Sequence, residues 1–287
     1  MAKREKEFGL ELSQAMAEKG PLCVGIDPHP ALLNAWGLSD DAVGLREFSL
    51  RVVEAMAGQV AAVKPQSAFF ERHGSKGIAV LEQTLEALRQ AGLLSILDVK
   101  RGDIGSTMAG YAQAYLSDES SLAADAITLS PYLGFGSLSA AIELAQQNNR
   151  GVFVLDLTSN PEGASVQHAR GADGVAVAAN ICQGVAQANK AAIDAGQLGS
   201  IGMVVGATVG DAVANLGLDL AASGGPLLAP GVGAQGAGAP ELEQVFANAR
   251  PQVLASTSRG VLKAGPKVDD LREAAKIACK TVKNALQ

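Results

Sequence analysis

The stretch Leu93-Leu94-Ser95-Ile96-Leu97-Asp98-Val99-Lys100-Arg101-Gly102-Asp103-Ile104 joins an apolar run directly to a cluster of charges. If the run is a buried strand, side chains two positions apart point the same way, so Asp98 and Lys100 project together from its carboxyl end. Gly102 then turns the chain before Asp103. Buried charges are costly unless they pair. The cluster is therefore either a structural salt bridge or an active site, since strand carboxyl ends carry the chemistry in α/β folds.

Eight short apolar runs rich in Val, Ile and Leu recur along the chain, with helix-like segments between them. They are residues 21–26, 59–64, 93–99, 125–130, 151–157, 200–206, 225–231 and 251–256. Near-continuous apolar runs are typical of parallel strands that are covered on both faces. Eight β/α units predict a closed (β/α)8 TIM barrel. A doubly wound open sheet is the alternative, but it usually carries a G-x-G-x-x-G motif after an early strand, and none follows Ile26.

The whole chain, residues 1–287, fits a single α/β barrel domain, because no linker or low-complexity segment divides it. We expect an N-terminal helix over about residues 5–18, a helix over 71–90 and a C-terminal helix over 268–286. The longest gap between strands, 158–199, has room for a loop and a helix that begins near Gly174.

The composition excludes several classes of partner. Aromatic residues make up only 4% of the chain, and the net charge is −6, which argues against nucleic acid. Three distant cysteines suit a reducing compartment, and the three histidines show no zinc-binding spacing. The charged N-terminus does not look like a signal peptide, and no apolar run could span a membrane. We therefore expect a soluble, cytoplasmic protein without a metal or a membrane partner. A small phosphorylated ligand remains compatible with this charge.

Other predicted strands also end in polar residues. Asp27 and Lys64 each end a run and precede a proline, which stops the strand and leaves the charge at the rim. The fifth run ends in Thr158-Ser159-Asn160. Alone, each has a plain explanation: a capping aspartate, a surface lysine or a simple turn. In a barrel, however, all of them would face Asp98 and Lys100 across one mouth.

The last two strand ends are suited to an anion. The seventh run continues into a glycine-rich loop that contains Gly233 and Gln235, and the eighth is followed by Arg259 and Gly260. Glycines let backbone N–H groups approach an anion, and barrel phosphate sites commonly form after strands seven and eight. The sequence therefore predicts a phosphate site beside the charged cluster.

Alternating lysines and aspartates next to a phosphate site suit decarboxylation without a cofactor. A fixed carboxylate near the substrate carboxylate disfavours the bound ground state. A fixed ammonium group stabilises the carbanion that develops as CO2 leaves and then donates a proton to it.

These residues resemble orotidine 5'-phosphate decarboxylases over most of the chain, from Gly25-Ile26-Asp27 to Ser258-Arg259-Gly260. The most specific element is Leu97-Asp98-Val99-Lys100-Arg101-Gly102-Asp103-Ile104-Gly105. The segments 64–71 and 158–161 are similar to the longer, type 2-like bacterial branch of the family. The resemblance implies a lyase without a cofactor that converts orotidine 5'-phosphate to UMP and CO2, the last step of de novo pyrimidine biosynthesis.

The resemblance also implies catalytic roles. Lys100 would donate the proton to C6, and Asp98 would sit against the departing carboxylate. Lys64 and Asp27 would hold the ribose hydroxyls and complete an alternating Lys-Asp-Lys-Asp network. Asp103 and, with it, Ile104 would reach into the neighbouring subunit's site, which implies a homodimer with shared active sites.

For substrate binding, the resemblance assigns the phosphate to Gln235 and Arg259, within loops that also contain Gly233 and Gly260. Ser159 would read the pyrimidine amide, with Thr158 and Asn160 as alternatives because the segment after the fifth strand is long. Gln66 receives no role.

Three other functions are compatible with parts of the pattern. A Mg²⁺-dependent phosphate barrel would need another acid beside Asp98, but residue 96 is Ile. A Schiff-base aldolase would need Lys100 or Lys64 with a lowered pKa, and neighbouring carboxylates act the other way. A non-catalytic phosphate-binding barrel would not need the buried Asp98 and Lys100 pair.

Overall fold

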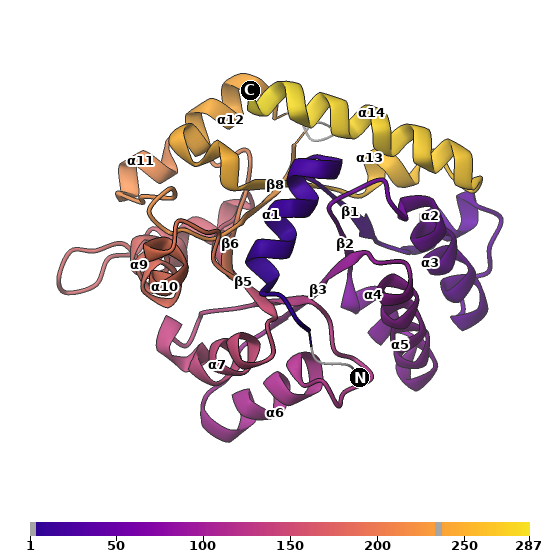
Figure 1. Cartoon of the computed structure of the whole chain (residues 1–287), viewed down its shortest axis with the longest axis horizontal. Helices are drawn as coiled ribbons and strands as arrows, with labels where there is room; N and C mark the ends of the chain where they lie inside the picture. Colours follow the sequence, from indigo (N-terminus) through magenta and orange to yellow (C-terminus); the bar gives the residue numbers. More distant parts are fainter. Residues whose placement is uncertain (1–3, 233–236) are drawn as a thin grey trace.

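A computed structural model describes residues 4–232 and 237–287. Eight parallel strands pair in chain order around a closed barrel (Figure 1). They are β1 Leu22–Ile26, β2 Ala62–Pro65, β3 Leu94–Arg101, β4 Ala126–Leu129, β5 Gly151–Leu157, β6 Ile201–Val205, β7 Leu227–Pro230 and β8 Val253–Thr257. The closure is direct, because Leu22 of β1 pairs in register with Ala255 of β8. The predicted TIM barrel is confirmed, and the open-sheet alternative is wrong.

Helices surround the barrel and cover the outer faces of its strands (Figure 1). The α-helices are α1 Phe8–Lys19, α2 Pro30–Ala35, α3 Ala42–Met56, α4 Ser67–Glu71, α5 Gly74–Gln90, α6 Gly105–Leu116, α7 Ser139–Gln147, α8 Ala164–Gln167, α9 Val177–Ala188, α10 Lys190–Asp194, α11 Ala212–Leu216, α12 Ala239–Phe246, α13 Arg259–Leu262 and α14 Val268–Leu286. Short 3₁₀ helices are η1 Phe135–Leu138, η2 Pro161–Gly163 and η3 Ala247–Gln252. No helix within the described residues is long and apolar enough to cross a membrane.

The helix expected over residues 71–90 is confirmed as α5 but begins three residues later, at Gly74, because Glu71 belongs to the preceding short helix α4. Gly74 has a φ of +62°, a left-handed conformation that glycine adopts without steric cost. The break turns the chain between the two helices. The helix expected near Gly174 begins at Val177, because Gly174 also has a positive φ, of +79°, in the turn before it.

Helix α1 crosses the amino-terminal end of the barrel (Figure 1). Its Phe8, Leu12 and Met16 are buried against residues of the barrel interior. The Phe8 ring meets the Phe153 ring edge to face, with centroids 6.0 Å apart. A Cβ at residue 151 would lie 2.3 Å from the Phe8 ring, so the first position of β5 must be glycine. The helix therefore fills this end of the barrel and leaves the opposite end for ligands.

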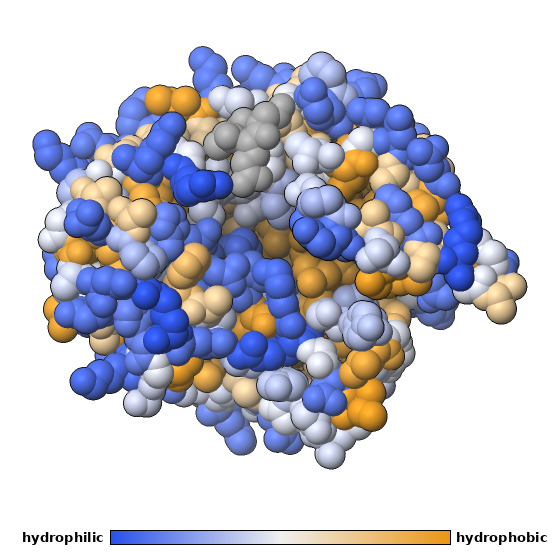
Figure 2. Space-filling model, turned by 180° about the vertical axis from the view of Figure 1, so that it is seen from behind, coloured by the Kyte–Doolittle hydropathy of each residue, from blue (hydrophilic) through white to orange (hydrophobic). Residues whose placement is uncertain are grey.

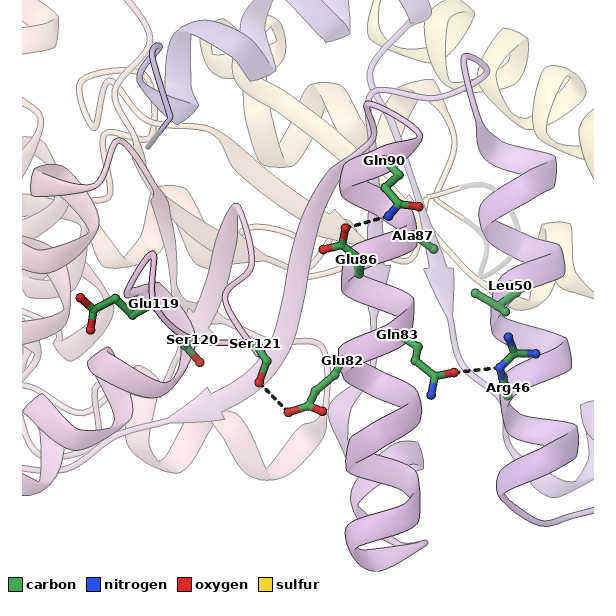
Figure 3. Close-up of a pocket in the computed structure, with 10 residues that line it drawn as sticks. All are labelled: Arg46, Leu50, Glu82, Gln83, Glu86, Ala87, Gln90, Glu119, Ser120 and Ser121. Atoms are coloured by element: carbon green, nitrogen blue, oxygen red, sulfur yellow. Dashed lines mark hydrogen bonds between the residues drawn. The ribbon is translucent and has the colours of Figure 1, made fainter. Parts of the chain in front are cut away.

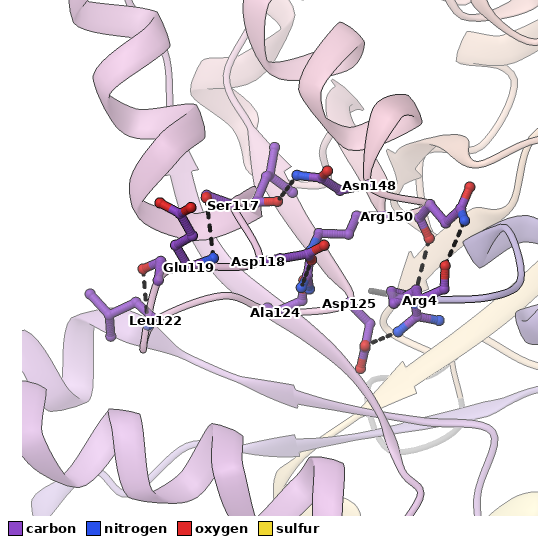
Figure 4. Close-up of polar contacts among 12 residues, drawn as sticks. Arg4, Ser117, Asp118, Glu119, Leu122, Ala124, Asp125, Asn148 and Arg150 are labelled. Carbon is purple, nitrogen blue, oxygen red and sulfur yellow. Dashed lines mark hydrogen bonds and ion pairs between the residues drawn. The ribbon is translucent and has the colours of Figure 1, made fainter. Parts of the chain in front are cut away.

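A polar network fastens the segment before α1 to this end of the barrel (Figure 4). Arg4 forms ion pairs with Asp125 and Glu11. Nearby, the buried Arg150 donates to Asp118 Oδ1 at 2.7 Å. Because Asp118, Asp125 and Arg150 lie in the loops before β4 and β5, the network supports the barrel on the side away from the charged strand ends.

Candidate active site

A cavity of about 880 Å³ opens at the carboxyl ends of the strands. Figure 2 shows this face, which is hollowed near its centre. Nine of the sequence-predicted residues line the cavity: Asp27, Lys64, Asp98, Lys100, Thr158, Ser159, Asn160, Arg259 and Gly260. Asp103 and Ile104 do not line it within this chain. Gly233 and Gln235 lie outside the described residues.

The carboxylate of Asp98 is the centre of the charged cluster. Its Oδ2 accepts hydrogen bonds from Lys64 Nζ at 2.8 Å and from Gln66 Nε2 at 2.9 Å. Its Oδ1 accepts from Lys100 Nζ at 2.5 Å and from Thr128 Oγ1 at 2.8 Å. Both oxygens are thus fully satisfied, which is the condition under which a carboxylate can be buried.

Lys100 reaches Asp98 through an irregular backbone and not through regular strand alternation. The register of β3 against β4 shifts between Leu97 and Arg101, which is a β-bulge. Within it Lys100 has a φ of +45°, where a non-glycine residue costs about 1–3 kcal/mol. Its backbone N–H donates to Thr128 Oγ1 at 3.0 Å. Bulges commonly re-aim a side chain next to an active site, and this one brings the Lys100 ammonium group back onto Asp98.

Asp98 and Lys64 remain charged over a wide pH range. Burial acts to raise the pKa of Asp98, but Lys64 and Lys100 lower it more strongly, so this pKa lies well below the ordinary value. Burial acts to lower the pKa of Lys64, but Asp98 and Asp27 together raise it above the ordinary value. The buried Oδ1 of Asp27 has no hydrogen-bond partner among the described residues. Asp27 can therefore accept a hydrogen bond from a ligand hydroxyl in the cavity.

Sequence reasoning missed two donors to Asp98. Gln66, left without a role above, forms a parallel bridge with Asp98 and donates to its carboxylate. Thr128 lies in β4, whose end was not considered because it carries no charge. Thr128 could have been found from its position, because a hydroxyl group in an apolar strand next to β3 can form hydrogen bonds with the charged side chains of β3.

The phosphate side of the cavity is built from the end of β8. Ser258, Arg259 and Gly260 line it together with Gly231 from the end of β7. Lys263 also lines it, one helical turn after Arg259, and was missed because it follows α13 and not a strand. Arg259 and Lys263 therefore give this side of the cavity two cationic side chains suited to a dianion.

A second hollow, of about 760 Å³, lies along α5 on the outside of the barrel and is lined also by α3 and by residues 119–121 after α6 (Figure 3). Its polar side chains largely bond one another. Arg46 donates to Gln83 at 2.8 Å, and Ser121 donates to Glu82 at 2.6 Å. This surface lacks the strand-end charges, so the cavity at the barrel mouth is the candidate active site. Among the described residues there is no group of three or more His, Cys, Asp or Glu side chains that could hold a metal ion.

The fold and the site together define a class: a (β/α)8-barrel enzyme with a charged active site at the carboxyl ends of its strands. Comparison with known proteins gives the family. The orotidine 5'-phosphate decarboxylase / HUMPS family model matches residues 20–274. The chain belongs to this family, as its sequence motifs predicted.

Individual relatives are similar over nearly their whole length. The orotidine 5'-phosphate decarboxylase of Salinispora arenicola is 58% identical over 270 residues, covering 94% of this chain and 95% of that protein. The corresponding protein of Streptomyces coelicolor is 56% identical, covering 93% and 94%. A crystal structure from Streptomyces avermitilis, assigned as the same enzyme, has a TM-score of 0.92 at 54% identity and covers 98% of this chain and 96% of its own.

The lowered pKa of Asp98 predicts how its contribution to stability depends on pH. A carboxyl group with a lower pKa in the folded state stabilises the fold above its unfolded pKa of about 4, and this contribution disappears as the pH falls toward the folded value. We expect Asp98→Asn to lower the free energy of unfolding by about 3 kcal/mol because it leaves Lys64 buried without its counter-ion. The loss should be constant from about pH 5 to 9 and shrink below about pH 4.

Denaturant unfolding at several pH values measures this. The control is Asp194→Asn, which removes an exposed ion pair with Lys190 and should change the free energy of unfolding by about 0.5 kcal/mol or less. An Asp98→Asn effect that varied between pH 5 and 7 would contradict the prediction.

Proposed function

We propose that this protein decarboxylates orotidine 5'-phosphate to UMP and CO2 without a cofactor, as a cytoplasmic enzyme of pyrimidine biosynthesis. The observation that carries the proposal is the Lys64–Asp98–Lys100 cluster, which shares one cavity with Asp27 and Arg259. Membership of the decarboxylase family agrees with it. The three cysteines are buried and unpaired, which suits a reducing compartment.

The reaction follows from where the charges lie. With substrate bound, Asp98 faces the substrate carboxylate, and their repulsion disfavours the bound ground state. The bond between C6 and the carboxyl carbon breaks, CO2 leaves, and the electron pair stays on C6. The Lys100 ammonium group stabilises this carbanion and then gives C6 a proton, which solvent later restores. The side chain of Lys100 is 46% exposed, so it can reach both the ligand and solvent.

The remaining cavity residues hold the substrate. Asp27 and Lys64 bind the ribose hydroxyls, with Asp27 Oδ1 supplying an acceptor that has no partner among the described residues. Arg259 and Gly260 bind the phosphate, together with Gly233 and Gln235, which lie outside the described residues. Of the three residues that follow β5, Ser159 reads the pyrimidine.

The active site is shared in a homodimer, to which Asp103 and Ile104 contribute across the interface. Ile104 is 62% exposed, and Asp103 does not line the cavity of its own chain. Tyr132 and Leu133, which follow β4, are also exposed apolar residues. Large exposed apolar side chains are typical of an interaction surface, here next to the mouth of the barrel.

A direct assay tests the proposed function. Mixing the protein with orotidine 5'-phosphate should lower the absorbance of the orotate chromophore, at a rate unchanged by EDTA. Activity that EDTA abolished would contradict the cofactor-free mechanism. Tight binding of the nucleotide with no absorbance change would contradict catalysis altogether.

Lys100→Ala should lower turnover by at least about 10³-fold, because it removes both the cation that stabilises the carbanion and its proton donor. UMP should still bind, since the phosphate and ribose contacts remain. Turnover measured beside a UMP titration separates the two effects. Full activity of this variant would refute the role given to Lys100.

The shared site can be tested with mixed dimers. Lys100→Ala and Asp103→Ala should each be inactive alone. After subunit exchange, half of the dimers are hybrids with one intact site each, so activity should recover to about a quarter of the wild-type value. No recovery, despite exchange shown by differently tagged subunits, would place Asp103 within its own chain's site.

A further inference from the structure

The loop at the end of β5 is fixed by Gln167, a residue that the proposed mechanism does not use. The side chain of Gln167 contacts Thr158 twice. Its Oε1 accepts from the Thr158 backbone N–H at 3.0 Å, and its Nε2 donates to Thr158 Oγ1 at 2.7 Å. Gln167 ends the short helix α8, so this pair of bonds ties the helix to the rim of the cavity.

The same loop is built to accommodate this contact. A Cβ on Gly163 would lie 2.8 Å from Thr158 Oγ1 and 3.0 Å from both terminal atoms of the Gln167 side chain. On the other side, Gly206 N–H donates to Leu157 O at 2.8 Å, and a Cβ on Gly206 would lie 3.3 Å from the Ser159 nitrogen. The loop is therefore held between α8 and the end of β6, with glycine at both points of closest approach.

The hydrogen bonds leave one side chain of the loop available. Thr158 Oγ1 accepts from Gln167 and donates to Asn160 Oδ1 at 2.7 Å, while Asn160 Nδ2 donates to Glu162 at 3.0 Å. The Ser159 hydroxyl has no hydrogen bond within the described part of the chain, and Ser159 lines the cavity. Of the three candidates, Thr158 and Asn160 are occupied within the loop, and Ser159 is the one positioned for a ligand.

We propose that Gln167 is a positioning residue for pyrimidine recognition: by fixing Thr158 and, through it, Asn160, it orients Ser159 toward the base. This inference rests on the proposed function, because the base is the pyrimidine of the substrate. Gln167 touches no reacting atom. Its effect is confined to the end of the cavity formed by β5, whereas the phosphate side is formed by the end of β8.

The test compares two ligands, UMP and ribose 5-phosphate, by calorimetric titration of the full-length protein. Gln167→Ala should weaken UMP binding about five- to tenfold, which corresponds to the net contribution of about one hydrogen bond. It should leave the binding of ribose 5-phosphate unchanged. Val166→Ala is the matched control, because Val166 is the preceding residue of α8 and is 43% exposed. It should bind both ligands as the wild type does.

A double-mutant cycle identifies the route. Thr158→Val removes only the bond from Gln167 Nε2 to Thr158 Oγ1 and keeps the bond from the Thr158 backbone N–H to Gln167 Oε1. It should therefore weaken UMP binding no more than Gln167→Ala does, and the double variant should bind UMP about as Gln167→Ala alone does. Equal UMP affinity in the wild type and Gln167→Ala would overturn the proposal. So would a Thr158→Val effect much larger than that of Gln167→Ala, because Thr158 would then contact the base itself. Equal weakening of both ligands would indicate general damage to the site and would also overturn it.

The proposal is judged on UMP binding and not on turnover. A wild-type protein that bound UMP but did not decarboxylate orotidine 5'-phosphate would contradict the proposed reaction and leave the positioning role of Gln167 intact.

Discussion

The buried carboxylate of Asp98 is the constraint on which the rest of the site depends. Its four donors come from β2, the bridge that follows β2, β3 and β4. Only a parallel sheet with all carboxyl ends at one edge brings them together. Apolar residues of the same size would make a more stable barrel end, because pairing rarely offsets the full cost of burying charges. The arrangement is therefore explained by the reaction that we propose and not by stability.

Much of the barrel could be predicted from the sequence because parallel strands buried on both faces have a simple pattern. Each of the eight apolar runs coincides with a strand, to within a few residues at its ends. The charges that end those strands, Asp27, Lys64 and Asp98, line the cavity for the same reason. Position along a strand predicts which edge of the sheet a residue occupies, and this was sufficient to predict that these three residues lie in one site.

What could not be predicted depends on register and on local backbone geometry. Strand alternation gave the correct partner for Lys100 but not the β-bulge through which it reaches Asp98. Gln66 and Thr128 contact Asp98 only because neighbouring strands align at particular residues. The register in which strands pair cannot be read from a single sequence. Lys263 enters the cavity through a helical turn after β8. Strand-end reasoning therefore finds the charged residues of the site but not all of the residues that orient them.

Helix α1 has a consequence for the traffic of small molecules. Phe8, Leu12 and Met16 close the amino-terminal end of the barrel, so within the described residues the cavity opens only at the carboxyl ends of the strands. The nucleotide and the CO2 released from it must therefore enter and leave through the same opening. The loops at the carboxyl ends of the strands consequently control product release as well as substrate entry.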